Sequence, residues 1–322
     1  MLLFHMRKPV PVPISLPSVR LLQIDAESAG QRLDNFLIRH CKGVPKSHLY
    51  KAIRNGEVRV NKGRIAADYR LLQGDTVRVP PLRLPAPNES RPVPPAVFPV
   101  VYEDDALLVI DKPAGTAVHG GSGVSFGVIE QLRASRPEAP MLELAHRLDR
   151  ETSGLLMVAK KRSALVALHD MLRESRGRKR YLALVVGDWV NDRQHLRQPL
   201  LKWLTAAGER RVKVDPAGKA AHTIISLKKR YGRYTLLEAE LRTGRTHQIR
   251  VHLAASGYPI VGDEKYGRDE VRAQFAKQGF NRMFLHAAHL EIPHPLTGEL
   301  LDLHAPLPPA CEQLLESLEK NP

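Results

Sequence analysis

A proline-rich segment constrains the fold of this chain more than any other feature of the sequence. Residues 80–95 read PPLRLPAPNESRPVPP and include seven prolines. Proline lacks a backbone N–H donor and favours extended polyproline II structure over a helix or the interior of a sheet. The segment therefore predicts a boundary between two domains, with a small domain at 21–80, a linker at 81–96 and a large domain at 97–322. Residues 1–20 remain an unassigned N-terminal tail.

The small domain shows helical spacing followed by alternation. Leu33, Phe36 and Leu37 lie on one face of an expected helix, and Leu49 and Ile53 lie on one face of a second helix, between Pro45 and Gly56. The segments around residues 58–60 and 77–79 then alternate apolar and polar side chains, as short strands do. We expect a small α/β domain.

This small domain is strongly basic. Residues 31–80 contain eleven Lys and Arg against four Asp and Glu, a net charge of +7 within a total of +15 for the chain. A solvated basic face is the simple interpretation, but the pattern resembles the RNA-binding domain named after ribosomal small-subunit protein four. The scarcity of aromatic side chains favours contact with the backbone of a folded RNA over base stacking. The candidate RNA-binding residues are Arg32, Lys46, Lys51, Arg54, Arg59, Lys62 and Arg64.

Other features exclude several classes of protein. Two cysteines, Cys41 and Cys311, are too few for a disulfide framework or a thiolate zinc site, which favours a reducing compartment. The N-terminal segment lacks a signal-peptide pattern, and no apolar run reaches the roughly 18 residues of a membrane span. We expect a cytoplasmic protein without membrane association. The histidines at 286, 289, 294 and 304 lack clustered acids or thiols in the sequence, so we predict no metal site.

The large domain contains many apolar runs separated by turns. Strand-like runs occupy residues 106–111, 154–160, 181–187 and 233–244, and one amphipathic helix is expected at 163–175. Many strands with few helices predict an α+β fold with a mainly antiparallel sheet. No sustained heptad repeat is present, so we expect a monomer.

Three polar stretches in this domain are candidates for chemistry. Asp149 lies in HRLDRETSG, on an expected loop between two extended segments, where its alternative role is an Asx-turn. Arg250 lies in RTGRTHQIRVH, where a helix with a basic solvent face is the alternative. Tyr181 begins the strand KRYLALVV and would otherwise be a core aromatic residue.

Together and in this order, HRLD, KRYLALV and GRTHQIRVH resemble the RluA family of ribosomal large-subunit pseudouridine synthases, and are most similar to its RluC branch. The resemblance extends from about Ala29 to Pro308. It implies that Asp149 is indispensable, that Tyr181 packs on the target base and that Arg250 pairs with Asp149.

Arg147 is then a candidate for holding a phosphate or for filling the gap left by a flipped nucleotide. The implied reaction converts uridines of 23S ribosomal RNA to pseudouridine and requires no cofactor. Two alternatives remain: a non-catalytic protein that binds RNA or takes part in ribosome assembly, and a metal-dependent nuclease. The nuclease would need several convergent carboxylates, whereas these stretches offer one.

Overall fold

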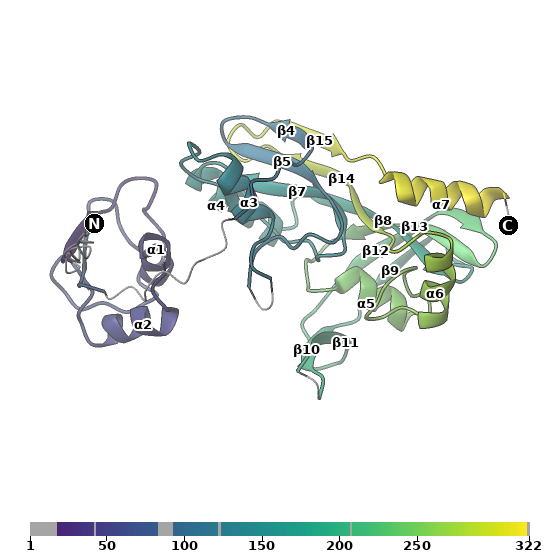
Figure 1. Ribbon diagram of the computed structural model, residues 1–322, viewed down its shortest axis with the longest axis horizontal. Coiled ribbons are helices and arrows are strands. Elements are labelled where there is room, and N and C mark those ends of the chain that lie inside the picture. The colour runs from purple at the N-terminus through teal and green to yellow at the C-terminus, as the bar shows by residue number, and fades with distance from the viewer. Residues whose placement is uncertain (1–17, 42, 83–92, 122–123, 207, 321–322) are drawn as a thin grey trace, which may run out of the picture. The chain divides into compact units, whose positions relative to one another are not determined.

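The computed structural model describes residues 18–41, 43–82, 93–121, 124–206 and 208–320. The chain divides into two compact units, Met1–Pro92 and Val93–Pro322 (Figure 1). Residues 1–17 of the expected tail and residues 83–92 of the expected linker lie outside the described residues.

In its described residues, the N-terminal unit contains two helices and a three-stranded antiparallel sheet in the order β1-β3-β2. Leu33 and Phe36 of the first helix and Leu49 of the second pack into one hydrophobic core with the strands, as the spacing of the apolar residues predicts. Strand β1 was not expected, because its sequence RLLQ does not alternate and is mostly exposed; pairing with β3 makes it a strand. The elements are β1 Arg20–Gln23, α1 Leu33–His40, α2 Lys46–Arg54, β2 Arg59–Val60 and β3 Thr76–Val79.

A large, mainly antiparallel sheet forms the centre of the C-terminal unit. Its strands run in the order β4-β5-β7-β14-β8-β13-β12-β9, with β15 paired to β14 and β6 paired to β7. A separate hairpin consists of β10 and β11. The strands of the large sheet are β4 Val100–Glu103, β5 Leu107–Lys112, β6 Glu143–Leu144, β7 Ser153–Ala159, β8 Arg178–Val186, β9 Arg193–Leu196, β12 Thr223–Tyr231, β13 Tyr234–Leu241, β14 Leu285–Pro293 and β15 Leu300–His304, and those of the hairpin are β10 Leu200–Leu204 and β11 Arg210–Val214.

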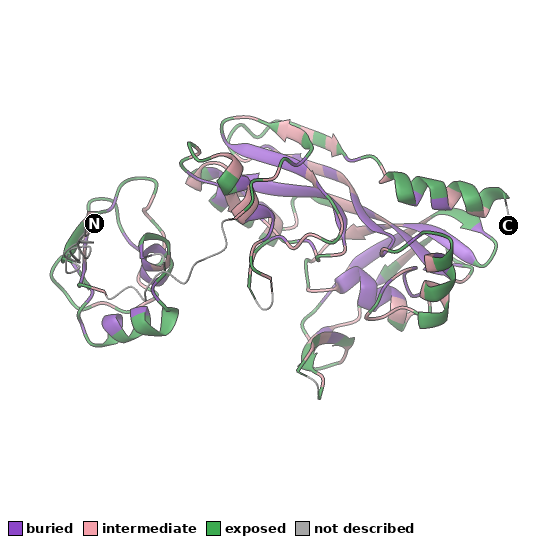
Figure 2. Cartoon of the chain, viewed as in Figure 1, coloured by how far each residue is buried: buried purple, intermediate pink, exposed green. Residues whose placement is uncertain are grey.

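Helices cover both faces of the sheet, which explains why residues 107–110 of β5 and 154–159 of β7 are apolar. Side chains that alternate along these two strands enter two separate cores. Figure 2 shows that the strands at the centre of the sheet are largely buried. Helices α3 and α5 contribute to one core and α4 contributes to the other. The described residues of this unit form the helices α3 Val128–Ser135, α4 Arg162–Arg173, α5 Gln248–Ala255, α6 Asp269–Lys277 and α7 Pro309–Lys320. The predicted α+β class is confirmed.

One junction of the sheet positions the Asp149 loop. Among the described strands of the large sheet, β7 and β14 form the parallel pair, through Ser153 with His286 and Gly154 with Ala287. Gly154 has φ +108°, and a Cβ atom there would lie 2.6 Å from the backbone nitrogen of Ala287. The strands can therefore approach only because residue 154 has no side chain.

Within the described part of the chain, no helix is long and apolar enough to cross a membrane.

Candidate active site

Asp149 lies in the loop between β6 and β7, where the backbone N–H of Thr152 donates to the Asp149 carbonyl at 3.1 Å. A buried lysine holds this loop against the end of β5. The Lys112 ammonium donates to the carbonyl oxygens of Pro113, Thr116 and Arg150, at 2.7, 2.9 and 3.1 Å. Burial lowers the pKa of Lys112 to about 7, while the carboxylates of Glu151 and Asp149 act in the opposite direction. The loop that carries Asp149 is thus tied to the sheet through its backbone.

Arg250 of α5 connects two carboxylates. Its Nε and Nη2 atoms donate to the two oxygens of Asp263 at 2.8 and 2.7 Å, and its Nη1 donates to Oδ2 of Asp149 at 3.1 Å. The Asp263 side chain is fully buried and also accepts the backbone N–H groups of Lys265 and Tyr266. The predicted contact between Arg250 and Asp149 is therefore present, and Asp263 fixes the direction of the guanidinium fork.

The second oxygen of Asp149 faces a histidine. Oδ1 lies 3.9 Å from Nε2 of His247, whose Nδ1 lies 2.8 Å from the Tyr266 hydroxyl. That hydroxyl also accepts the Val212 N–H at 2.9 Å. Burial lowers the pKa of His247, although Asp149 opposes this shift. The distance of 3.9 Å between Oδ1 of Asp149 and Nε2 of His247 is too long for a hydrogen bond, so His247 does not occupy this oxygen.

The segment before α5 is shaped by a buried amide. The Gln248 side-chain oxygen accepts from the Thr243 hydroxyl at 2.7 Å and from the Arg245 N–H at 3.0 Å. Its nitrogen donates to the His222 carbonyl and to the Thr223 hydroxyl. These bonds place His247 in a left-handed conformation, φ 53°, which is uncommon outside glycine and is often found at functional sites.

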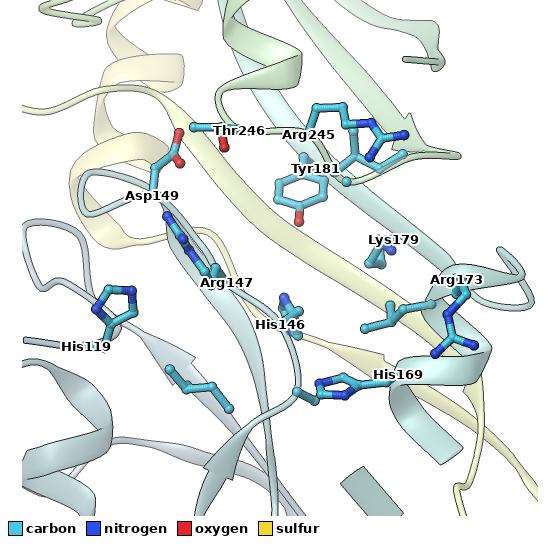
Figure 3. Close-up of a pocket in the computed structure, with 15 residues that line it drawn as sticks. His119, His146, Arg147, Asp149, His169, Arg173, Lys179, Tyr181, Arg245 and Thr246 are labelled. Carbon is cyan, nitrogen blue, oxygen red and sulfur yellow. The ribbon is translucent and has the colours of Figure 1, made fainter. Parts of the chain in front are cut away.

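A cavity of about 760 Å³ opens beside Asp149. Figure 3 shows Arg147 next to Asp149, with Tyr181 and Lys179 farther along and His169 and Arg173 beyond them. Its lining residues are His119, Leu144, Ala145, His146, Arg147, Asp149, His169, Leu172, Arg173, Lys179, Tyr181, Leu241, Gly244, Arg245 and Thr246. Among these described residues, Asp149 is the single carboxylate, and four others are Lys or Arg.

Tyr181 is 6% exposed and belongs both to the core and to the cavity wall. Burial, reinforced by the carboxylate of Asp149, raises the pKa of Tyr181, so its phenol stays protonated at neutral pH. Arg147 is exposed and has no ion-pair partner among the residues that the structure describes. The three predicted residues Asp149, Tyr181 and Arg250, together with Arg147, therefore meet in one place.

The candidate RNA-binding residues of the N-terminal unit differ in their surroundings. All seven are exposed. Arg32 already makes a bidentate ion pair with Asp34, at 3.1 and 2.7 Å, which leaves it less available to RNA. Arg59 donates to the carbonyl oxygens of Gly56 and Lys62. Lys46, Lys51 and Arg54 project from α2, and Lys62 and Arg64 follow β2.

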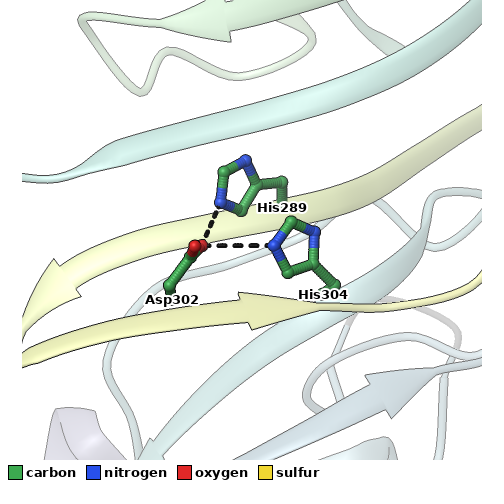
Figure 4. A group of neighbouring side chains, drawn as sticks. All are labelled: His289, Asp302 and His304. Atoms are coloured by element: carbon green, nitrogen blue, oxygen red, sulfur yellow. Dashed lines mark hydrogen bonds and ion pairs between the residues drawn. The ribbon is translucent and has the colours of Figure 1, made fainter.

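One group of side chains has the composition of a metal site. His289, Asp302 and His304 lie together on the paired strands β14 and β15 (Figure 4). Arg180, however, donates to Nδ1 of His289 at 3.0 Å, so the proton of a neutral ring is on Nε2, which faces Asp302. That nitrogen then has no lone pair for a metal, and the group instead holds β15 to β14. The sequence alone did not place an acid beside these histidines.

Sequence reasoning did not single out His247, Gln248, Lys112 or Asp263. His247 and Gln248 lie inside the motif that ends in Arg250. The sequence shows these residue types there but does not show which residues they contact. Asp263 belongs to the stretch GDEKYG and carries no local signal, since its partner is thirteen residues away on a helix.

One carboxylate lines a basic cavity on a mainly antiparallel sheet, and the chain also carries a compact basic domain. Together these features indicate an enzyme that acts on nucleic acid. Comparison with known proteins identifies the class further. The family model of RNA pseudouridylate synthase matches residues 106–255, and the S4 domain model matches residues 31–77.

Full-length relatives are similar over nearly the whole chain. A protein of Yersinia pestis named ribosomal large subunit pseudouridine synthase C is 51% identical over 95% of this chain and 97% of its own length. The protein of the same name from Escherichia coli K12 is also 51% identical, over 94% and 97%. The chain therefore belongs to the RNA pseudouridylate synthase family and is an RNA pseudouridine synthase, an isomerase.

Solved structures support the same fold. Human RNA pseudouridylate synthase domain containing 1 has 26% identity and a TM-score of 0.56, covering 70% of this chain and 96% of its own. Human RNA pseudouridylate synthase domain containing 4 has 24% identity and a TM-score of 0.57, covering 69% of this chain and 93% of its own. This second similarity is evidence for a shared fold only. The predicted family and the predicted S4-type domain are confirmed.

Proposed function

We propose that this enzyme isomerises uridines to pseudouridine in the 23S RNA of the large ribosomal subunit, with Asp149 as the catalytic carboxylate. The names of its 51%-identical relatives support this substrate. The observation that carries the catalytic assignment is the position of Asp149: it is the one carboxylate among the described residues lining a basic cavity, with one oxygen fixed by Arg250.

The reaction balances without a cofactor. The bond from ribose C1′ to N1 of the uracil breaks, the uracil turns, and C1′ bonds to C5. The proton displaced from C5 is offset by one gained at N1, so no atom enters or leaves. The step needs a carboxylate beside the ribose, which acts either as a nucleophile at the sugar or as a base. Oδ1 of Asp149 is the oxygen available for this contact.

Three neighbours support this carboxylate. Arg250 donates to Oδ2 of Asp149 at 3.1 Å and so holds that oxygen, which leaves Oδ1 free to face the substrate. Tyr181 offers an aromatic face in the cavity wall, against which a flipped uracil stacks. Arg147, which is exposed at the cavity beside Asp149, binds an RNA phosphate or occupies the space that the uridine leaves.

The alternative function, an RNA-binding protein without catalysis, is less well supported. Such a protein has no need for a buried Arg250 held bidentately by a fully buried Asp263, because burying these charges costs free energy. RNA binding alone would be served by exposed lysines and arginines.

The test is a substitution that changes charge without changing shape. Asp149→Asn should fold and bind RNA like the wild type but form no pseudouridine in a 23S RNA fragment, measured by chemical mapping of modified positions. Glu151→Gln is the matched control, because Glu151 lies in the same loop but pairs with the exposed Arg150. Turnover by Asp149→Asn at even a few per cent of wild type would contradict the catalytic assignment.

The substrate is tested separately from the chemistry. Ribosomal RNA from cells with and without the protein should differ at defined uridines of the large subunit. If pseudouridines disappear from another RNA and 23S RNA is unchanged, the proposed substrate is wrong while the activity stands.

A further inference from the structure

The far end of the cavity contains a lysine that the proposed chemistry does not use. Lys179 lies two residues before Tyr181 on β8, and residues two apart point to the same face of a strand. Both side chains line the cavity, and Figure 3 shows them side by side. Along the strand, Lys179 is about 7 Å beyond the proposed base-stacking residue.

Lys179 has no counter-charge among the residues that the structure describes. Among the described residues, no carboxylate or carbonyl oxygen pairs with its ammonium. The other two cations at this part of the cavity do have partners: Arg173 forms an ion pair with Asp170, and Arg245 donates to the Ala220 carbonyl. Burial lowers the pKa of Lys179. An unpaired, partly desolvated cation costs free energy in the free protein, and this cost is recovered when an anion binds.

The neighbours of Lys179 are also suited to an anion. His169 and Arg173 are one turn apart on α4 and line the same end of the cavity. Nε2 of His146 accepts the Met157 N–H at 3.1 Å, and burial lowers the pKa of His146 to about 3, so it stays neutral beside the lysine. The carboxylate of Glu143, on β6, is not available to neutralise this end of the cavity. It pairs with Arg133 at 3.0 Å and does not line the cavity.

We propose that Lys179, with Arg173 and His169, forms a subsite for a phosphodiester group of the RNA strand next to the uridine bound at Asp149. The subsite rests on the proposed function, because it takes the same strand that places its uridine against Tyr181. It converts the unpaired charge of the free enzyme into binding free energy and fixes which nucleotide of the strand reaches Asp149. Lys179 is therefore a positioning residue and makes no contact with the reacting atoms.

The test uses three variants of the full chain. Lys179→Met keeps the length of the side chain without its charge, and Lys179→Arg keeps the charge. Lys277→Met is the matched control, since Lys277 is an exposed lysine on α6 that does not line the cavity. The substrate is a 23S RNA fragment that the wild type modifies, in versions with one neutral methylphosphonate at each position flanking the uridine.

Lys179→Met should raise the melting temperature of the free enzyme, because it removes an unpaired cation. It should weaken RNA binding about tenfold and lower the slope of log affinity against log salt by about 0.7, with KM rising and kcat little changed. Lys179→Arg should bind like the wild type. One methylphosphonate should weaken wild-type binding equally and have no further effect in Lys179→Met, because both changes remove the same contact.

Each of these measurements can contradict the proposed phosphate subsite. A lower melting temperature with unchanged affinity would show that Lys179 is structural, and additive effects of Lys179→Met and every methylphosphonate would show that it meets no flanking phosphate. A kcat as low as that of Asp149→Asn would place Lys179 in the chemistry. If Asp149→Asn still forms pseudouridine while Lys179→Met weakens RNA binding as expected, the proposed function fails and the subsite stands.

Discussion

Arg250 shows how one side chain contributes to both stability and activity. Its removal leaves the fully buried carboxylate of Asp263 without its partner. We expect Arg250→Ala to lose about 3–5 kcal/mol of unfolding free energy as well as activity, measured by denaturant titration and single-turnover assays. The pair of substitutions Arg250→Met and Asp263→Asn should recover much of the stability and none of the activity. An Arg250→Ala variant as stable as the wild type would contradict the anchoring role of Asp263.

Substitutions of Tyr181 can separate its packing in the protein core from its proposed stacking on the target base. Tyr181→Phe keeps the ring and should retain most activity, whereas Tyr181→Leu keeps apolar bulk in the core but loses the aromatic face. Since stacking on a base is worth about 1–3 kcal/mol, the Leu variant should lose roughly 5- to 150-fold in kcat/KM. Circular dichroism checks folding. Equal loss in the Phe and Leu variants would assign the main role to the hydroxyl group.

At the scale of elements, the parallel contact between β7 and β14 carries the Asp149 loop. Gly154→Ala would place a methyl group against the Ala287 backbone at a φ that favours glycine. We expect a loss of about 3 kcal/mol or more, visible by calorimetry as a melting temperature lowered by roughly 6–12 °C. Gly244→Ala is the control, because a Cβ atom there meets nothing within 4 Å. Similar melting curves for the two variants would show that the junction tolerates a side chain.

At the scale of the whole molecule, the N-terminal unit is expected to capture RNA without taking part in the chemistry. A chain that begins at Val97 keeps Asp149, Tyr181 and Arg250 and loses the basic residues of α2 and β2. Its pseudouridine formation at saturating RNA should persist, while its affinity falls. Loss of even three phosphate contacts should lower the salt slope by about 2–3. Affinity for a ribosomal RNA fragment across a salt series measures this, and an unchanged slope would return the basic face to the role of a solvated surface.

Much of this protein followed from local sequence alone. Helical spacing predicted α1, α2 and α4, and apolar runs predicted β5, β7, β8 and β13, because each element buries one face or both. The start of β8 was missed: it begins at Arg178, where polar side chains face the cavity and the opposite side of the sheet, and no apolar pattern marks it. The motifs around Asp149, Tyr181 and Arg250 named the site, since they consist of residue types that carry chemistry.

Only the tertiary structure decided which distant residues support that site. Strand β14 lies between β7 and β8 although it begins 126 residues after the end of β7 and 99 after the end of β8. This order brings the Asp149 loop to the same place as Tyr181. The partners of Arg250 and Lys112, and the absence of a partner for Lys179 among the described residues, have no local signature. A periodic pattern records which face of an element is buried, whereas contacts between elements depend on how those faces pack, and that packing sets the charges around Asp149.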